Sequence, residues 1–288
     1  MRTPLTAAVL APLMLLALGC APQASSTAVD SDASPSTNAT PADCAQGKTL
    51  TDGVLTIGTD SPAYDPWFSN NDPTNGKGFE SAVAYAVAKQ LGFDASAVTW
   101  TKVPFNSSYA PGPKKFDFDI NQISITPERA KVVDFSTPYF DSNIGVLIQK
   151  GADVTEDNIT SKSCAAYAGT TSVDFLQKEL HCASTKIYPD SPTLYQGLLS
   201  GQVDADFLDT AIVLAEAKQT GDKLEVVGQY KTGEKYGAIY PKGSANEDAL
   251  NQGIQTMLSD GTLDTLSKDY LGPAFGGDPS SVPIWTIK

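Results

Sequence analysis

Apolar residues in the folded part of this chain follow two different periodicities. Residues 54–59 form a short β-rich run that ends at a Pro-containing turn, which predicts a strand. Between residues 79 and 91, Val83, Val87 and Leu91 recur at intervals of four, so they share one face of a predicted helix. The folded region therefore begins with a strand followed by an amphipathic helix.

The same alternation continues to the C-terminal end. Further strands are predicted at 98–103, 119–125, 144–148, 164–167, 205–208 and 238–240. Further helices are predicted at 172–180, after Ser191, which is expected to cap its helix, and at 210–218. Two C-terminal helices are expected to bury one face each, the first with Leu250, Ile254 and Leu258 and the second with Leu263, Leu266 and Tyr270. Strands alternating with helices favour mostly parallel sheets covered on both faces. Ligands of such sheets bind beyond the carboxyl ends of the strands.

The first twenty residues have the pattern of an export signal. Arg2 precedes the apolar segment 5–18, which is too short to serve as a stable membrane span. Residues 16–20, Leu-Ala-Leu-Gly-Cys, resemble a bacterial lipobox, with Ala17 where Leu is commoner. This resemblance implies cleavage before Cys20 and lipidation of that residue. The alternative is an ordinary secretory signal with an incidental cysteine.

The amino-acid composition adds a predicted tether and a constraint on the binding partners. Residues 21–45 are rich in Ala, Ser, Thr, Pro and Asp, which predicts a flexible tether after the signal. The whole chain of 288 residues is 41% hydrophobic and 18% charged, as in ordinary soluble globular proteins. Its net charge of −13 disfavours binding to nucleic acid or to anionic lipid.

The cysteines and the one histidine indicate a disulfide but no metal site. Besides Cys20 the chain has three cysteines, and export permits disulfides. Cys164 and Cys182 are close in sequence, so we pair them, which leaves Cys44 over. His181 and the cysteine spacings match no zinc template, and we expect His181 at the surface. No cofactor is expected.

Three features at predicted strand ends suit a single kind of ligand. Arg129, in Ser124-Ile-Thr-Pro-Glu-Arg129, offers a bidentate fork for a carboxylate. The predicted helix start near Ser172 adds donors for an anion, and Asp209 can accept hydrogen bonds from an ammonium group. Together they match a free amino acid. Singly, each also fits a surface ion pair or a capped turn.

These segments carry a resemblance to a known family. Ser124–Tyr139, the opening Ile57–Asp60 with Pro66-Trp67, and Gly78–Phe93 look like the polar amino acid-binding proteins of ABC importers, solute-binding protein family 3. Gly169-Thr-Thr171 and Gly201–Ala205 also match. The resemblance covers roughly residues 54–271. It implies a substrate-binding protein, not an enzyme, that delivers an amino acid to a membrane permease.

The resemblance also implies a role for each matching residue. Arg129 is expected to hold the ligand α-carboxylate, assisted by Ser124 and by Thr170 or Thr171 of the opposite lobe. Asp209 is expected to hold the α-ammonium group. Both Arg129 and Asp209 are expected to face an open, wet cleft in the empty protein, so that the loss of either would scarcely affect folding.

The remaining matches shape the pocket around the ligand side chain. Tyr64, Trp67 and Phe105 are expected to form aromatic walls, although core packing is the alternative for each. Asp60 and Gln122 are expected to approach the side chain or the ammonium group.

The identity of the ligand cannot be inferred from the family, because the sequence departs from the family pattern in the part of the pocket that is expected to receive the ligand side chain. Residues 106–115 replace a short apolar helix, Asn121 and Gln122 replace small residues, and Tyr167 lies where some members have Lys. We favour a polar uncharged or basic amino acid, such as glutamine or arginine, over glutamate or aspartate, unless Lys114 or Lys115 reaches into the pocket.

The predicted fold is an α/β clamp of two lobes with two hinge crossings, in the manner of periplasmic binding proteins. Residues 46–140 and 236–288 form lobe 1, and residues 141–235 form lobe 2, which closes on the ligand by a hinge motion. We expect a monomer held by lipid at the extracellular face of the membrane. The rivals are an enzyme on the same scaffold, such as a dehydratase or cell-wall lyase, and a sensory ligand-binding domain.

Overall fold

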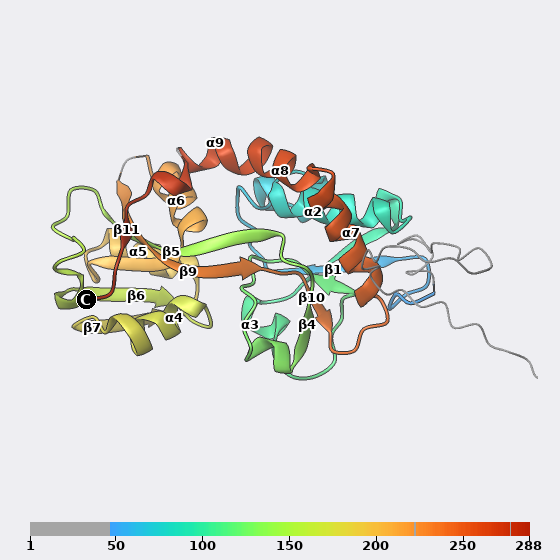
Figure 1. The fold of residues 1–288 in the computed structure, drawn as a ribbon, viewed down its shortest axis with the longest axis horizontal. Coiled ribbons are helices and arrows are strands. Elements are labelled where there is room, and N and C mark those ends of the chain that lie inside the picture. Colours follow the sequence, from blue (N-terminus) through green and yellow to red (C-terminus); the bar gives the residue numbers. More distant parts are fainter. Residues whose placement is uncertain (1–46, 222, 277) are drawn as a thin grey trace, which may run out of the picture.

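The computed structural model describes residues 47–221, 223–276 and 278–288. Two β-sheets lie at opposite ends of an elongated molecule, and helices cover them (Figure 1). The two-lobed α/β fold expected from the sequence is therefore confirmed. The export signal, the tether, Cys20 and Cys44 lie outside the described residues.

The first sheet is mixed. Its order is β2-β1-β3-β10-β4, with β1 (Leu55–Thr59), β2 (Val98–Lys102), β3 (Phe118–Asp119), β4 (Val133–Phe135) and β10 (Ile239–Pro241). Strands β2 and β3 pair with β1 in parallel, whereas β10 runs antiparallel to both of its neighbours. The strand predicted at 119–125 is wrong beyond Asp119, because the chain leaves the sheet there for the loop that carries Gln122.

The second sheet is also mixed. Its order is β11-β9-β5-β8-β6-β7, with β5 (Phe140–Gln149), β6 (Ser163–Tyr167), β7 (Ser184–Tyr188), β8 (Ala205–Asp209), β9 (Leu224–Tyr236) and β11 (Ile284–Trp285). Strand β6 pairs in parallel with β7 and β8, and β5 pairs antiparallel with β8 and β9. Strand β11 also pairs in parallel with β9, so both sheets mix parallel and antiparallel pairs where we predicted mostly parallel sheets.

Apart from two short helices at 105–108 and 272–275, which were not predicted, the helices agree closely with the predicted periodicities. They are α2 (Phe79–Gln90), α3 (Phe105–Ser108), α4 (Thr171–Phe175, continued by a π-helical turn to Leu180), α5 (Ser191–Leu199), α6 (Thr210–Gln219), α7 (Glu247–Ser259), α8 (Thr262–Leu266, continued by a π-helical turn to Leu271) and α9 (Gly272–Phe275). Two details differ. Asp190, not Ser191, caps α5, because its carboxylate accepts from the Thr193 amide at 2.8 Å. Leu258 is exposed, and Met257 is buried in its place.

Strands β5 and β9 link the two sheets. They run antiparallel, with Phe140 opposite Tyr236, at the point where the chain enters the second sheet from β4 and leaves it toward β10. In Figure 1 these two strands reach from one lobe to the other. Tyr236 also bridges to Ser124 in the first lobe.

The expected assignment of residues 236–288 to the first lobe is wrong at its C-terminal end. After β10, helices α7 and α8 pack with α2 around the first lobe's core. The last strand, β11, instead pairs with β9 in the second sheet, and Trp285 packs against Tyr230 there. The described chain therefore passes between the sheets a third time, because burying Trp285 requires the second lobe's core.

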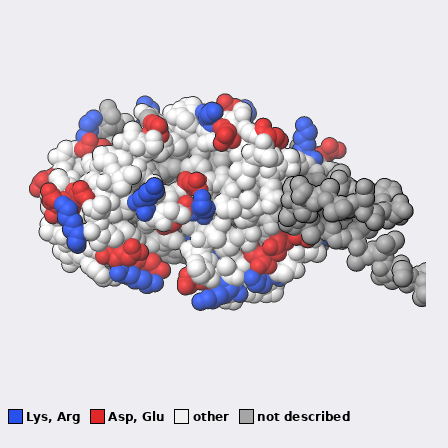
Figure 2. All heavy atoms as spheres, in the orientation of Figure 1, with Lys and Arg blue, Asp and Glu red and all other residues white. Residues whose placement is uncertain are grey.

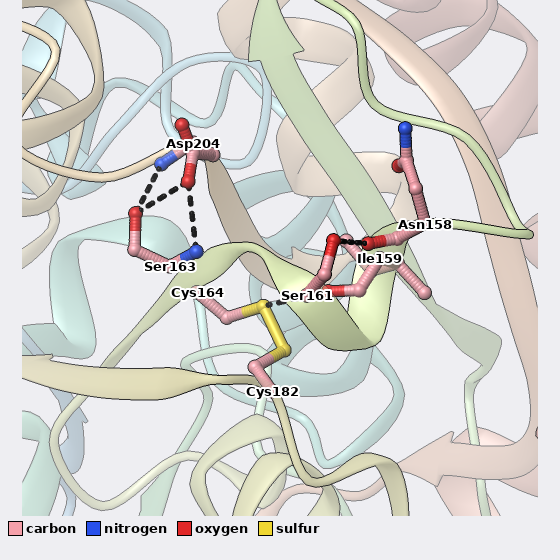
Figure 3. The surroundings of a disulfide bond; sticks show 7 residues. All are labelled: Asn158, Ile159, Ser161, Ser163, Cys164, Cys182 and Asp204. Atoms are coloured by element: carbon pink, nitrogen blue, oxygen red, sulfur yellow. Dashed lines mark hydrogen bonds between the residues drawn. A yellow bond between two sulfur atoms is a disulfide. The ribbon is translucent and has the colours of Figure 1, made fainter.

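The predicted disulfide between Cys164 and Cys182 is present. Cys164 lies on β6 and Cys182 follows the π-helical turn after α4, with 6.1 Å between their Cα atoms (Figure 3). His181, the adjacent residue, is exposed in a left-handed conformation at the helix end, as predicted. The disulfide thus fastens α4, the helix whose N-terminus faces the inter-lobe cleft, to its sheet.

Charged side chains of both signs are interspersed over the face in Figure 2, without a patch of one sign. Among the described residues, no group of three or more His, Cys, Asp or Glu side chains is arranged to hold a metal ion. No helix in the described part of the chain has both the length and the apolarity needed to cross a membrane.

Candidate functional site

A cavity of about 440 Å³ lies between the two lobes. It is lined from the first lobe by the loop after β1, the start of α3 and the loop after β3, and from the second lobe by the ends of β6, β7 and β8 and by helices α5 and α6. Seven of the ten ligand-binding residues predicted from the sequence line it: Asp60, Tyr64, Trp67, Phe105, Gln122, Thr170 and Asp209. The other three, Ser124, Arg129 and Thr171, lie beside the cavity.

Asp209 is the buried carboxylate of this cavity. It ends β8 and begins α6, and only 5% of its surface is exposed. The Ser142 hydroxyl donates to its Oδ1 at 2.7 Å. Burial, together with the charge of Glu234, raises the pKa of Asp209 to about 7. A cation that enters the cavity would therefore stabilise the charged form of this buried carboxylate.

The aromatic residues differ in what they do. Trp67 is 2% exposed and packs edge-on against Phe79, Phe140 and Tyr236, so it is a core residue that also forms the cavity wall. Tyr64 is 43% exposed and lies at the opening. Core packing, which was the alternative role for these aromatic residues, therefore applies to Trp67, although Trp67 also forms the cavity wall. It does not apply to Tyr64.

Phe105 is positioned by Asp60. The Asp60 Oδ2 atom accepts from the Phe105 amide at 3.1 Å, and Oδ1 accepts from the Ser61 amide at 2.6 Å. The Phe105 ring lies against Tyr167 of the other lobe, with 5.6 Å between ring centroids. Asp60 therefore holds the backbone of Phe105, the residue through which the first lobe contacts Tyr167 of the second lobe.

Gln122 is held by a buried carboxylate that sequence analysis missed. Glu80 on α2 is fully buried; it accepts from the Gln122 amide at 2.7 Å, and the Gln122 side chain and the Tyr139 hydroxyl also donate to it. Burial raises the pKa of Glu80 to about 7. Gln122 has a positive φ of 48°, which these bonds stabilise. Its placement in the cavity is thus fixed by α2.

Arg129 is already paired within the chain. It is 7% exposed; Nη1 donates to the Ser124 carbonyl at 2.6 Å and Nη2 to the Gly169 carbonyl at 2.8 Å. Its guanidinium carbon lies 4.4 Å from the Tyr109 ring centroid and 5.6 Å from that of Phe105. Because Gly169 belongs to the second lobe, Arg129 joins the two lobes beside the cavity rather than lining it.

The hydroxyls expected to assist Arg129 surround an internal carboxylate. Ser124 Oγ and Thr171 Oγ1 donate to Glu234 Oε2 at 2.7 and 2.8 Å. Ser124 lies in the first lobe, Thr171 begins α4, and Glu234 lies on β9 where it links the lobes. The predicted carboxylate-binding hydroxyls therefore do converge, and the carboxylate that they bind here is the chain's own.

Asp190 and Glu216 are further acidic residues of the cavity that sequence analysis missed. Asp190 lies two residues beyond the end of β7, and Asp209 is the last residue of β8, so the strand-end rule that found Asp209 applied to Asp190 as well. Glu216 lies seven residues after Asp209 on α6, which places both on one helix face. Lys114, which we considered as a cavity cation, instead donates to the Ser107 carbonyl at 3.2 Å and does not line the cavity.

Comparison with known proteins agrees with this geometry. The family model described as bacterial extracellular solute-binding proteins, family 3, matches residues 55–273. The L-cystine-binding protein TcyJ of Escherichia coli K12 is 34% identical over 228 residues, 76% of this chain and 83% of that protein. The ABC transporter arginine-binding protein 1 of the same organism is 29% identical, over 73% and 88% of the two chains.

Solved structures show the same fold. An ancestral arginine-binding protein bound to arginine is similar, with a TM-score of 0.66 at 30% identity, over 76% of this chain and 98% of that one. Another similar structure is an ancestral amino acid-binding protein that is a precursor of cyclohexadienyl dehydratase, with a TM-score of 0.64 at 28% identity, over 76% and 95% of the chains. This chain belongs to the bacterial extracellular solute-binding proteins, family 3.

Proposed function

We propose that this protein is the substrate-binding component of an ABC importer and carries a polar uncharged or basic amino acid to a membrane permease. The observation that carries the proposal is the cavity between the lobes, with Asp209 buried in its wall. A volume of about 440 Å³ lies in the range of small-molecule sites. The names of its relatives, binding proteins for cystine, arginine and glutamine, support an amino-acid ligand.

In this proposal Asp209 pairs with the α-ammonium group, while Arg129, Ser124 and Thr170 or Thr171 hold the α-carboxylate. The ligand carboxylate takes the place of Glu234 between the two hydroxyls and of the Gly169 carbonyl at Arg129. The exchange is plausible chemically because a carboxylate accepts a bidentate Arg bond more strongly than a single neutral carbonyl does.

The rest of the cavity receives the ligand side chain. Tyr64, Trp67 and Phe105 enclose it, and Asp60 and Gln122 approach its polar end. The ribbon of β5 and β9 is the hinge, so that a ligand contacting both lobes favours their closed arrangement.

We also propose that the protein is not an enzyme. The described residues bring no Ser-His or Cys-His pair to the cavity, since His181 is exposed at the end of the α4 segment and Cys164 is bonded to Cys182. The precursor of a dehydratase among the similar structures is itself named as an amino acid-binding protein.

A ligand screen tests the proposal. Purified protein should unfold at a higher temperature in the presence of its amino acid, because a ligand at one hundred times its Kd stabilises the folded state by about 2.7 kcal/mol. The twenty L-amino acids and L-cystine are compared with their D-enantiomers, which can place both charged groups at Arg129 and Asp209 only by directing the side chain away from the rest of the cavity. If no L-amino acid shifts the melting temperature, the proposal fails.

We further propose that the protein acts as a monomer held by a lipid on Cys20 at the extracellular face of the membrane. The lipobox-like sequence before Cys20 supports the anchor. In the native host, Cys20→Ser should move the protein from the membrane fraction to the medium, whereas Cys44→Ser should leave it membrane-bound. Membrane retention of the Cys20→Ser protein would contradict the anchor.

A further inference from the structure

The cavity has a strongly one-sided charge. Five carboxylates line it, Asp60, Asp65, Asp190, Asp209 and Glu216, and no Lys, Arg or His is among its lining residues. A zwitterionic ligand brings one ammonium group, which suffices for Asp209 alone. The remaining carboxylates are therefore left facing the ligand side chain.

Glu216 is the member of this group that lacks a partner. It is half-buried, and its carboxylate makes no hydrogen bond or ion pair with any residue that the structure describes. By contrast, Asp60 accepts from two backbone amides and Asp190 caps α5. Burial raises the pKa of the Glu216 carboxyl. Burying a carboxylate without a partner costs free energy that a cationic ligand recovers.

A second unpartnered carboxylate lies beneath this end of the cavity. Asp206 on β8 is fully buried, and neither of its oxygens has a hydrogen-bond partner. It shares a strand face with Leu208, which lines the cavity, because alternate residues of a strand point to the same side. Burial and the negative charge of Glu216 both raise the pKa of Asp206. A second acidic group without a partner thus lies behind the cavity wall near Glu216.

The spacing of Asp209 and Glu216 defines a length. Both lie on one face of the α6 segment, and seven residues rise about 10 Å along a helix. This rise separates the backbone positions of the two residues, and it is of the same order as the distance between the α-ammonium and the side-chain cation of an extended arginine or lysine with a hydrogen bond of about 2.8 Å added at each end. Tyr64 and Tyr195 line the cavity near Glu216 and can enclose the methylene chain.

We infer that the ligand carries a second positive charge at the end of its side chain, as arginine and lysine do, and that Glu216 is the residue that selects it. The inference rests on the proposed amino-acid binding and narrows it. It disfavours glutamine, whose amide is neutral, and cystine, whose distal end carries a carboxylate beside its ammonium group and is therefore neutral overall.

The experiment compares L-arginine with L-citrulline, which has the same length but a neutral ureido group, by calorimetric titration of the purified protein. L-lysine, L-glutamine and L-cystine are titrated alongside. We expect arginine to bind at least about tenfold more tightly than citrulline, the discrimination typical of one charge-assisted hydrogen bond. Glu216→Gln should remove most of this preference while leaving citrulline affinity nearly unchanged.

Glu179→Gln is the matched control, since Glu179 is an exposed residue of the same lobe and does not line the cavity. It should keep the preference for arginine. Asp190 is not substituted, because its carboxylate also caps α5 and a change there would mix an effect on the helix with an effect on the charge. Melting curves of both variants establish that they are folded.

Three results would overturn the inference. Citrulline or glutamine binding as tightly as arginine would show that the second positive charge is not selected, and cystine binding as tightly as arginine would show that a net positive side chain is not required. Amino-acid binding itself would stand in either case. An arginine preference that survives Glu216→Gln would assign the selection to another residue. Absence of binding by every amino acid would instead overturn the proposed function.

Discussion

Arg129→Ala should weaken amino-acid binding by about 30-fold to several thousandfold, because removing one partner of a buried charge pair typically costs about 2–5 kcal/mol. The variant loses the fork that we propose for the ligand carboxylate. It also loses the bond from Nη2 to the Gly169 carbonyl, which joins the lobes in the structure. Both losses act in the same direction, against the closed arrangement.

The structure changes what this substitution does to folding. From the sequence alone we expected Arg129 to face an open, wet cleft, so that its loss would scarcely affect stability. That expectation is wrong, because Arg129 is 7% exposed and bonded to two carbonyls. We therefore expect a stability loss of about 1.5–3 kcal/mol, the value of a hydrogen bond to a charged group.

Lys131→Ala is the control for Arg129→Ala. Lys131 lies on the same short 3₁₀ turn and is exposed, so its loss removes a cation without touching the cleft. Calorimetric titration and denaturant unfolding are measured for both variants. Unchanged affinity in a folded Arg129→Ala protein would contradict the role proposed for Arg129, and only a stability loss would then remain as its contribution.

Asp209→Asn should weaken binding by a similar factor and should also remove a pH dependence. The α-ammonium group binds the charged carboxylate, whereas burial and Glu234 raise the pKa of Asp209 to about 7 in the empty protein. Below pH 7 the ligand must displace a proton. Affinity of the unaltered protein should therefore fall as pH decreases, by up to about tenfold per pH unit.

Stability of the empty protein should respond to pH in the opposite direction. The folded protein binds this proton more tightly than the unfolded chain, since the pKa of Asp209 is raised from 3.8 to about 7. The contribution of Asp209 to stability is therefore complete below pH 3.8 and is lost as pH rises through about 7. Binding and unfolding measured over the same pH range separate the two effects.

Two comparisons make the Asp209 result specific. Asp269→Asn changes an exposed carboxylate of the first lobe and should leave affinity and its pH dependence unchanged. Burial also raises the pKa of Glu80 to about 7 and raises the pKa of Glu216, so a pH dependence that remains in Asp209→Asn is assigned to these two carboxyl groups, Glu80 acting through Gln122. An affinity of the unaltered protein that does not vary between pH 5 and pH 8 would contradict the role of Asp209.

Much of the architecture could be predicted from the sequence because its signals are local. The four-residue spacing of Val83 and Val87 predicted α2, and the apolar run at 54–59 predicted β1, since a repeating pattern fixes which face of an element is buried. The strand-end rule likewise predicted that Asp209 and Thr170 lie at one cavity. Each of these inferences needs only the positions of neighbouring residues.

The partners of the charged groups were decided by tertiary structure. Arg129 bonds to Gly169, 40 residues away, and Ser124 bonds to Glu234, 110 residues away. The pairing of β11 with β9 is likewise a contact between distant segments, and it overruled the assignment of the C-terminal end to the first lobe. Sequence patterns specify which face of an element is apolar, whereas the packing of two lobes against each other determines which polar groups meet when that surface is buried.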